Sequence, residues 1–236
     1  GEEALRQPMA PFPEARFRDF TTNGDRSRFQ HENGPRWGRL TRLANAEWIE
    51  GKGRFLPALG ETIEALCADP TWVLSAHDTR LDNLEGRRVT IDLASANYAW
   101  QMAEILASFG EALPAQARAK GIDAVRKRAI DPYLRMARSG EYDNWWALSD
   151  ANWNPVCHAG VVGAALALPG LDDADRALVV GSARVLVRRF LGGFYPDGWT
   201  GEGVGYWSYG FGHFARLAET VRLATRGRED WLRWPE

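Results

Sequence analysis

Apolar side chains recur along most of the chain at the spacing of helices that bury one face. The clearest run predicts a helix over residues 91–109, whose apolar positions form one stripe: Ile91, Ala94, Tyr98, Met102, Ile105, Leu106 and Phe109. Gly110 is expected to end this helix, because glycine adopts the left-handed conformation that helix C-termini favour. The same spacing predicts further helices from about Trp37, over 59–66, over 115–137 and over 206–226.

Three local features refine this pattern. Residues 155–168 carry almost no polar side chain after His158, and a helix that is apolar on all sides is expected to be buried. Pro132 is expected to kink or split the helix over 115–137. Asp172 or Asp173 is expected to cap a helix that runs to about Leu191.

Strands are hard to find in this pattern, so the predicted fold class is all-α. Consecutive helices with short connections predict antiparallel hairpins. A buried helix that alternates with amphipathic ones, and long loops rich in glycine and aromatic residues, favour an (α/α) toroid of such hairpins. A ring of about six hairpins needs roughly 300 residues, so the toroid is expected to be incomplete in this chain. Residues 1–33 are rich in proline and polar residues and predict an irregular N-terminal arm, which leaves 34–236 for the toroid domain.

Composition removes several classes of function. The 236 residues carry 29 basic and 31 acidic side chains, which gives no electrostatic case for a nucleic-acid or membrane partner. No apolar run is long enough to predict a membrane span. The two cysteines, Cys67 and Cys157, predict buried thiols rather than a disulfide framework. No signal peptide is visible and the first residue is Gly1, which predicts a processed form or an excerpt of unknown localisation.

Eleven tryptophans are the one compositional anomaly, and three of them lie in a loop over residues 145–160. This loop precedes the predicted buried helix, whose free N–H groups and positive dipole end suit a carboxylate. It supplies indoles, amides and an imidazole as candidate site residues: Trp146, Asn152, Trp153, Asn154 and His158. An asparagine as helix cap with Pro155 in the first turn explains part of this loop without any function, but it does not explain His158.

A second loop, residues 192–210, has glycine at seven of its nineteen positions. Glycine lets the backbone turn tightly and approach a ligand closely. Tyr206 and Tyr209 are three residues apart, so both are expected on one face of the helix that follows. The candidate substrate-binding residues here are Trp199, Glu202 and Tyr209.

Taken in order, these segments resemble the heparinase II/III-like polysaccharide lyases. The resemblance covers roughly residues 37–225, and its motifs lie at 72–78, 91–94, 152–160, 196–199 and 202–209. It implies an (α/α) toroid followed by a β-sandwich region that this chain lacks. It also implies β-elimination of uronate-containing polysaccharides, an acidic polysaccharide or oligosaccharide as partner, and a periplasmic or secreted location. Neither a cofactor nor a metal ligand set is expected in this chain.

Carried over residue by residue, the resemblance places the catalytic groups at His158 and Tyr206. The interval between these two is slightly shorter than in the family, which leaves the choice between Tyr206 and Tyr209 open. Relatives that act on alginate have asparagine directly before this histidine, where this chain has Cys157, so the resemblance does not extend to alginate.

Elimination requires that the uronate carboxylate be neutralised while the C5 proton leaves. Asn152, Asn154 and the helix N-terminus are candidates for that neutralisation. Imidazole is basic near neutral pH and phenol is a ready acid, so His158 and a tyrosine suit the two proton transfers, in roles that the sequence does not divide. Glu202 is a candidate to orient the base or bind a sugar hydroxyl, and the alternative is an ordinary solvated loop carboxylate.

Two alternatives remain open at this point. A glycoside hydrolase needs two carboxylates across the sugar bond, and Asp197 with Glu202 is the only attractive pair. A non-catalytic carbohydrate-binding domain would use the tryptophan-rich loops alone. Of the other histidines, His213 is expected to pack, and His77 has no evident partner in the sequence.

Overall fold

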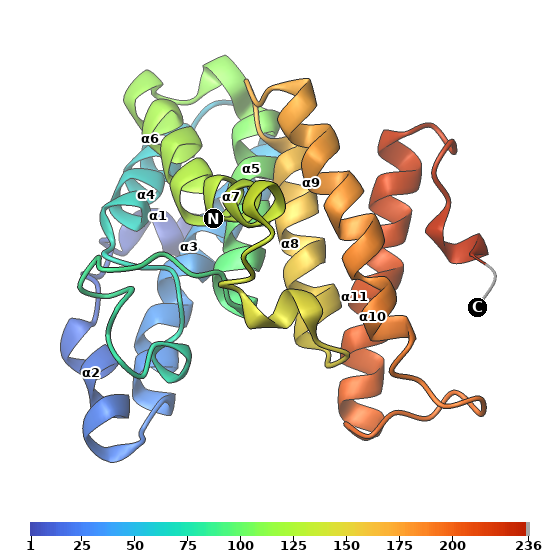
Figure 1. Ribbon diagram of the computed structural model, residues 1–236. Helices are drawn as coiled ribbons and strands as arrows, with labels where there is room; N and C mark the ends of the chain where they lie inside the picture. The colour runs from blue at the N-terminus through green and yellow to red at the C-terminus, as the bar shows by residue number, and fades with distance from the viewer. Residues whose placement is uncertain (235–236) are drawn as a thin grey trace.

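The structure, a computed structural model, describes residues 1–234 and contains no strand within them. The predicted all-α class is thus confirmed. Figure 1 shows the helices in chain order. They are α1 (Glu2–Arg6), α2 (Glu14–Asn23), α3 (Ser27–Glu50), α4 (Leu56–Ala68), α5 (Leu93–Phe109), α6 (Ala115–Val125), α7 (Asp131–Ser139), α8 (Trp153–Ala167), α9 (Asp173–Leu186), α10 (Arg188–Leu191) and α11 (Val204–Ala224).

The long helices α3 and α5 run side by side in the same direction. The rings of Trp37, near the middle of α3, and Tyr98, in the second turn of α5, stack with centroids 3.8 Å apart. One turn farther along, the Gln101 amide donates to the Thr41 hydroxyl. Because the second contact lies one turn closer to the C-terminal end in both helices, α3 and α5 are parallel.

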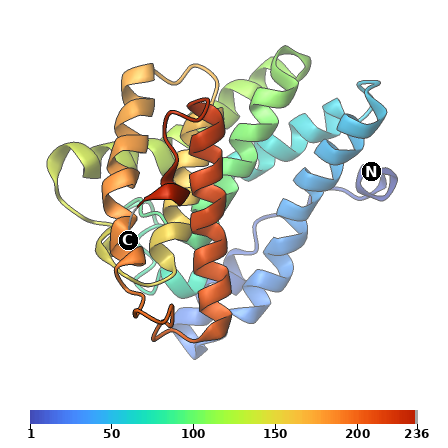
Figure 2. The same ribbon diagram turned by 90° about the vertical axis from the view of Figure 1, so that its right-hand side faces the viewer.

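Helices α8 and α11 continue this row in the same direction (Figure 2). Gly160 of α8 lies against Ala96 of α5, and one turn later Gly163 lies against the Trp100 ring. A Cβ atom at Gly163 would overlap that indole, so glycine is what allows α5 and α8 to approach so closely. Near its start, α11 places Gly210 against Asn152, the residue before α8.

Helices α4, α6 and α9 form a second layer, and they run antiparallel to the helices of the row. Gly121 of α6 packs against Leu106 near the end of α5, so this hairpin is antiparallel. Arg176 near the start of α9 donates to the Ala165 carbonyl near the end of α8. Each helix of the row, up to α8, is therefore followed in sequence by a helix of the second layer.

The predicted helix boundaries hold closely in this half of the chain. Helix α5 begins at Leu93, because Asp92 and Ser95 form a reciprocal capping box, and Gly110 is its C-cap. Asp172 caps α9 through two backbone N–H groups. The helix predicted to reach Leu191 breaks at Val187, after which α10 begins.

The helical run over 115–137 is interrupted, as the proline predicts. A π-helical turn, η3 (Arg126–Ile130), separates α6 from α7, and Pro132 occupies the first turn of α7. Proline is tolerated there because the first N–H groups of a helix have no partner within it.

The prediction of an irregular arm over residues 1–33 was wrong. This segment forms α1, α2 and the first turns of α3, and α3 continues through Pro35 rather than starting near Trp37. Phe17 and Phe29 are buried and pack edge to face at 4.9 Å. The sequence did not predict these helices because the segment is mostly polar and buries few apolar side chains, among them Phe17 and Phe29.

Buried arginines hold this N-terminal segment against α3 and α4. Arg36 donates to the Ala10 carbonyl at 2.9 Å and makes a two-pronged ion pair with Asp69 in which both distances are 2.6 Å. Both side chains of the pair are almost fully buried. Arg39 donates to the carbonyls of Ala4 and Gln7. Backbone carbonyls of an otherwise polar segment thus find their donors on α3.

Within residues 1–234, no helix is both long and apolar enough to cross a membrane. Both cysteines are free: Cys157 is buried, as predicted, whereas Cys67 is partly exposed. Burial raises the pKa of the Cys67 thiol to about 12.

Candidate functional site

The two loops singled out in the sequence meet at the N-terminal end of α8. The Glu202 carboxylate accepts the Asn152 backbone N–H at 2.7 Å and the Asn152 side-chain amide at 2.6 Å. Gly203 then adopts φ +84°, a conformation that favours glycine, and α11 begins at the next residue. This tie fixes the start of α11 beside the start of α8.

The tie also occupies both oxygens of Glu202 with protein donors. Asp197, the other carboxylate of the hydrolase alternative, accepts the Trp199 backbone N–H at 3.0 Å. Both carboxylates therefore shape the second loop, and this disfavours the pair as the acid and base of a hydrolase.

His158 lies in the core instead of at a cleft. Its ring is fully buried, Nδ1 is 3.0 Å from the Tyr133 hydroxyl on α7, and the Trp146 ring packs against it at 5.1 Å. The His158 side chain, predicted to be catalytic, therefore lines no cleft in this conformation, whereas Tyr206, its predicted partner, is 56% exposed. Helix α8 is buried on nearly every side. The face that carries His158 packs against Tyr133 of α7 and does not point to the surface.

Two other predicted binding residues also have structural roles. The Asn154 amide donates to three backbone carbonyls, those of Ala147, Ser149 and Leu186. The Trp146 indole donates to the Ile91 carbonyl at 2.7 Å. Both side chains are buried, so in this conformation neither reaches a substrate.

The structure separates the two candidate tyrosines. Tyr206 is 56% exposed and makes no hydrogen bond within residues 1–234, whereas Tyr209 is 38% exposed. Burial raises the pKa of Tyr209, and the nearby Cys157 and Asp92 groups add to that rise. Tyr209 is accordingly a protonated phenol at neutral pH. Its neighbour Gly210 packs against Asn152, the residue before α8.

A histidine–carboxylate pair that the sequence did not reveal lies at the same place. His77 Nδ1 is 2.7 Å from Asp92 Oδ2, across 15 positions of the sequence. Its ring contacts Trp153 at 4.5 Å, and Trp153 contacts the exposed Trp145 at 5.1 Å. In the sequence Asp92 falls inside the helix predicted over residues 91–109, and nothing there links it to His77. The group His77, Asp92, Trp145, Trp153 and Tyr209 is called the α8 mouth below.

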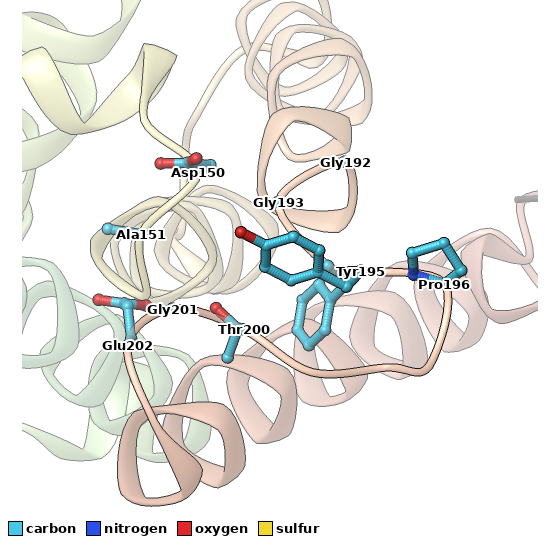
Figure 3. Close-up of a pocket in the computed structure, with 10 residues that line it drawn as sticks. Asp150, Ala151, Gly192, Gly193, Tyr195, Pro196, Thr200, Gly201 and Glu202 are labelled. Carbon is cyan, nitrogen blue, oxygen red and sulfur yellow. The ribbon is translucent and has the colours of Figure 1, made fainter.

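A pocket of about 470 Å³ lies beside Glu202, between Asp150 and Ala151 of the first loop and residues of the second loop (Figure 3). Asp150 and Ala151 lie on one side of it and the second loop on the other, with the Tyr195 hydroxyl extended toward Asp150. Trp199, a predicted binding residue, is 54% exposed on this loop and borders a neighbouring hollow with Tyr195. Within residues 1–234 its ring contact is with Tyr195, at 5.5 Å, and not with a ring of the α8 mouth.

Acid should destabilise the fold through His158. Burial lowers the pKa of His158 from its ordinary 6.5 to about 3. Between these values the unfolded chain binds a proton that the folded protein excludes, so stability falls as pH drops from 6.5 toward 3, by up to about 1.4 kcal/mol per pH unit. Urea unfolding of the wild type and of His158→Gln across this window measures the effect, and the variant should show the shallower pH dependence. Equal slopes in both proteins would contradict the prediction.

Searches against models of protein families and against characterised proteins found no match to this chain. Among residues 1–234 no group of three or more His, Cys, Asp or Glu side chains is arranged to hold a metal ion. The resemblance of the sequence and the geometry of the α8 mouth are therefore the observations that bear on function.

Proposed function

We propose that the chain is the catalytic helical part of a polysaccharide lyase that cleaves uronate-containing polymers by β-elimination, of the heparinase II/III-like kind. The observation that carries the proposal is the convergence at the α8 mouth. There the Glu202–Asn152 tie sets α11 beside α8, and Gly210, the residue after Tyr209, packs against Asn152, the residue before Trp153. These groups come from segments far apart in the sequence.

The proposed acid is Tyr209 rather than Tyr206. Its half-buried phenol is protonated at neutral pH and can give its proton to O4, the glycosidic oxygen that leaves from C4 of the uronate. Trp145 and Trp153 offer indole faces for the apolar side of a sugar ring. The N-terminal ends of α5 and α8 lie next to each other, and their dipoles favour the substrate carboxylate in this place.

The wider architecture that we propose is an arc of an (α/α) toroid. Two layers support it: α3, α5, α8 and α11 run in one direction, and α4, α6 and α9 run in the other. In a toroid of hairpins the first set would be the inner helices and the second set the outer ones. Tyr209 and the His77–Asp92 pair then lie at the N-terminal ends of the inner helices.

The reaction class is tested on the protein that carries this chain. Incubation with a panel of uronate polymers should give products with a C4–C5 double bond, seen as a rise in ultraviolet absorbance. Saturated product ends that carry oxygen from labelled water would indicate hydrolysis and reject the lyase. Polymer binding without any cleavage would instead favour the non-catalytic binding domain.

A further inference from the structure

We propose that His77 is the base that removes the C5 proton in this elimination, and that Asp92 is its positioning residue. The assignment rests on the proposed function. It replaces His158 in the role of base, because a fully buried ring does not reach a sugar in this conformation.

Asp92 is fixed on several sides and holds the His77 ring in one orientation. Its Oδ1 accepts the Ser95 backbone N–H at 2.7 Å, and its Oδ2 accepts the Leu74 backbone N–H at 2.9 Å. The carboxylate is 2% exposed, so it has little room to turn away. A carboxylate against Nδ1 stabilises the tautomer in which Nδ1 carries the proton, and the Nε2 lone pair is then ready to accept one.

The Nε2 atom is available to a ligand. It makes no hydrogen bond within residues 1–234, and the His77 side chain is 17% exposed. Trp153 packs against the ring and Trp145 extends the aromatic surface outward. A sugar stacked on these indoles would lie beside Nε2.

The position of Tyr209 completes the arrangement. Gly210, the residue after Tyr209, packs against Asn152 at the start of α8, and Trp153, the residue after Asn152, contacts the His77 ring at 4.5 Å. The proposed base and the proposed acid therefore come to one place from η1 (Ser75–His77) and from α11.

The other three histidines fit this role less well. His158 is buried against Tyr133. His213 has its Nδ1 on the Tyr209 carbonyl at 2.8 Å, so a backbone carbonyl and not a carboxylate orients that side of its ring. His31 is exposed on α3 and has no carboxylate partner in the part of the chain that the structure describes.

The elimination balances without water or a redox partner. Nε2 of His77 takes the C5 proton, and the C–H electron pair forms the C4–C5 double bond. The C4–O4 bond breaks, and O4 takes the proton of the Tyr209 hydroxyl. The two products are an unsaturated uronate end and a new free hydroxyl end, and proton exchange with solvent restores His77 and Tyr209.

The test compares His77→Ala with His31→Ala as the matched control, in the protein that carries this chain. Turnover in His77→Ala should fall by about 100-fold, at the low end for loss of a general base, while KM stays within a few-fold. Added imidazole should restore part of the lost turnover, since it can enter the space of the missing ring. Imidazole should change neither the control nor the wild type.

Asp92→Asn tests the positioning role separately, since asparagine still caps a helix. Nitrogen NMR of isotope-labelled histidine should show the His77 proton on Nδ1 in the wild type. It should show loss of that preference in the variant, together with a fall in kcat at unchanged KM. An unchanged tautomer in a variant that has lost turnover would contradict the positioning role.

The possible outcomes distinguish a failure of the proposed function from a failure of the assignment of His77 as the base. A wild type that makes no unsaturated ends overturns the proposed function, and the role of His77 with it. Lyase activity that survives in His77→Ala overturns the base assignment alone. A loss of turnover in folded His77→Ala that imidazole does not restore also counts against it, because a purely structural role would behave in that way.

Discussion

Replacing Tyr209 with phenylalanine should lower lyase turnover by about 10²–10⁴-fold, the usual contribution of general acid–base catalysis. The substitution removes only a hydroxyl, which makes no hydrogen bond within residues 1–234, so folding should survive. The ring would keep its contact with His213, at 4.6 Å, and substrate binding should change little. Steady-state kinetics on a uronate polymer, read as kcat and KM separately, measures the effect.

Tyr206→Phe is the matched control for this experiment. Tyr206 lies three residues earlier on the same helix and is more exposed, so its loss should be milder. Should Tyr206→Phe abolish turnover while Tyr209→Phe does not, the acid is assigned one helical turn too far along α11. If both folded variants keep wild-type turnover, neither tyrosine transfers the proton and the mechanism is wrong.

The largest loss of stability is expected from Arg36→Ala. Removing one partner of a buried ion pair leaves the other charge unpaired and typically costs about 3–5 kcal/mol. Burial raises the pKa of Asp69 even with Arg36 beside it. The same substitution removes the donor for the Ala10 carbonyl, so the N-terminal segment should loosen first. Denaturant unfolding gives the free energy, and hydrogen exchange in α1 and α2 gives the local effect.

A double variant separates the unpaired charge from the lost contacts. Arg36→Met with Asp69→Leu removes both charges and keeps most of the volume, and such replacements are often close to neutral. Its unfolding free energy should therefore lie nearer to the wild type than that of Arg36→Ala. Equal losses in the two variants would show that the ion pair matters through packing alone.

Part of the candidate site could be predicted from the sequence, and part of it could not. The two loops were recognisable from their indoles, amides and glycines, and they do meet, through Glu202 and Asn152. The sequence did not show which face of α8 points to solvent, because a helix that is apolar on all sides has no polar stripe to fix its rotation about its axis. His158 and Asn154 consequently point into the layer behind α8.

The sequence by itself determined the helical class and most helix boundaries, because these depend on local causes. Apolar spacing, the Asp172 cap and the glycine at 110 act within a few residues of one another. The tertiary structure alone decided that the N-terminal segment is helical, since its helices depend on donors and aromatic rings supplied by α3. It also decided that His77 has a carboxylate partner. That pairing forms only when the turn before α5 folds back onto the Asp92 cap, and no spacing in the sequence encodes such a contact.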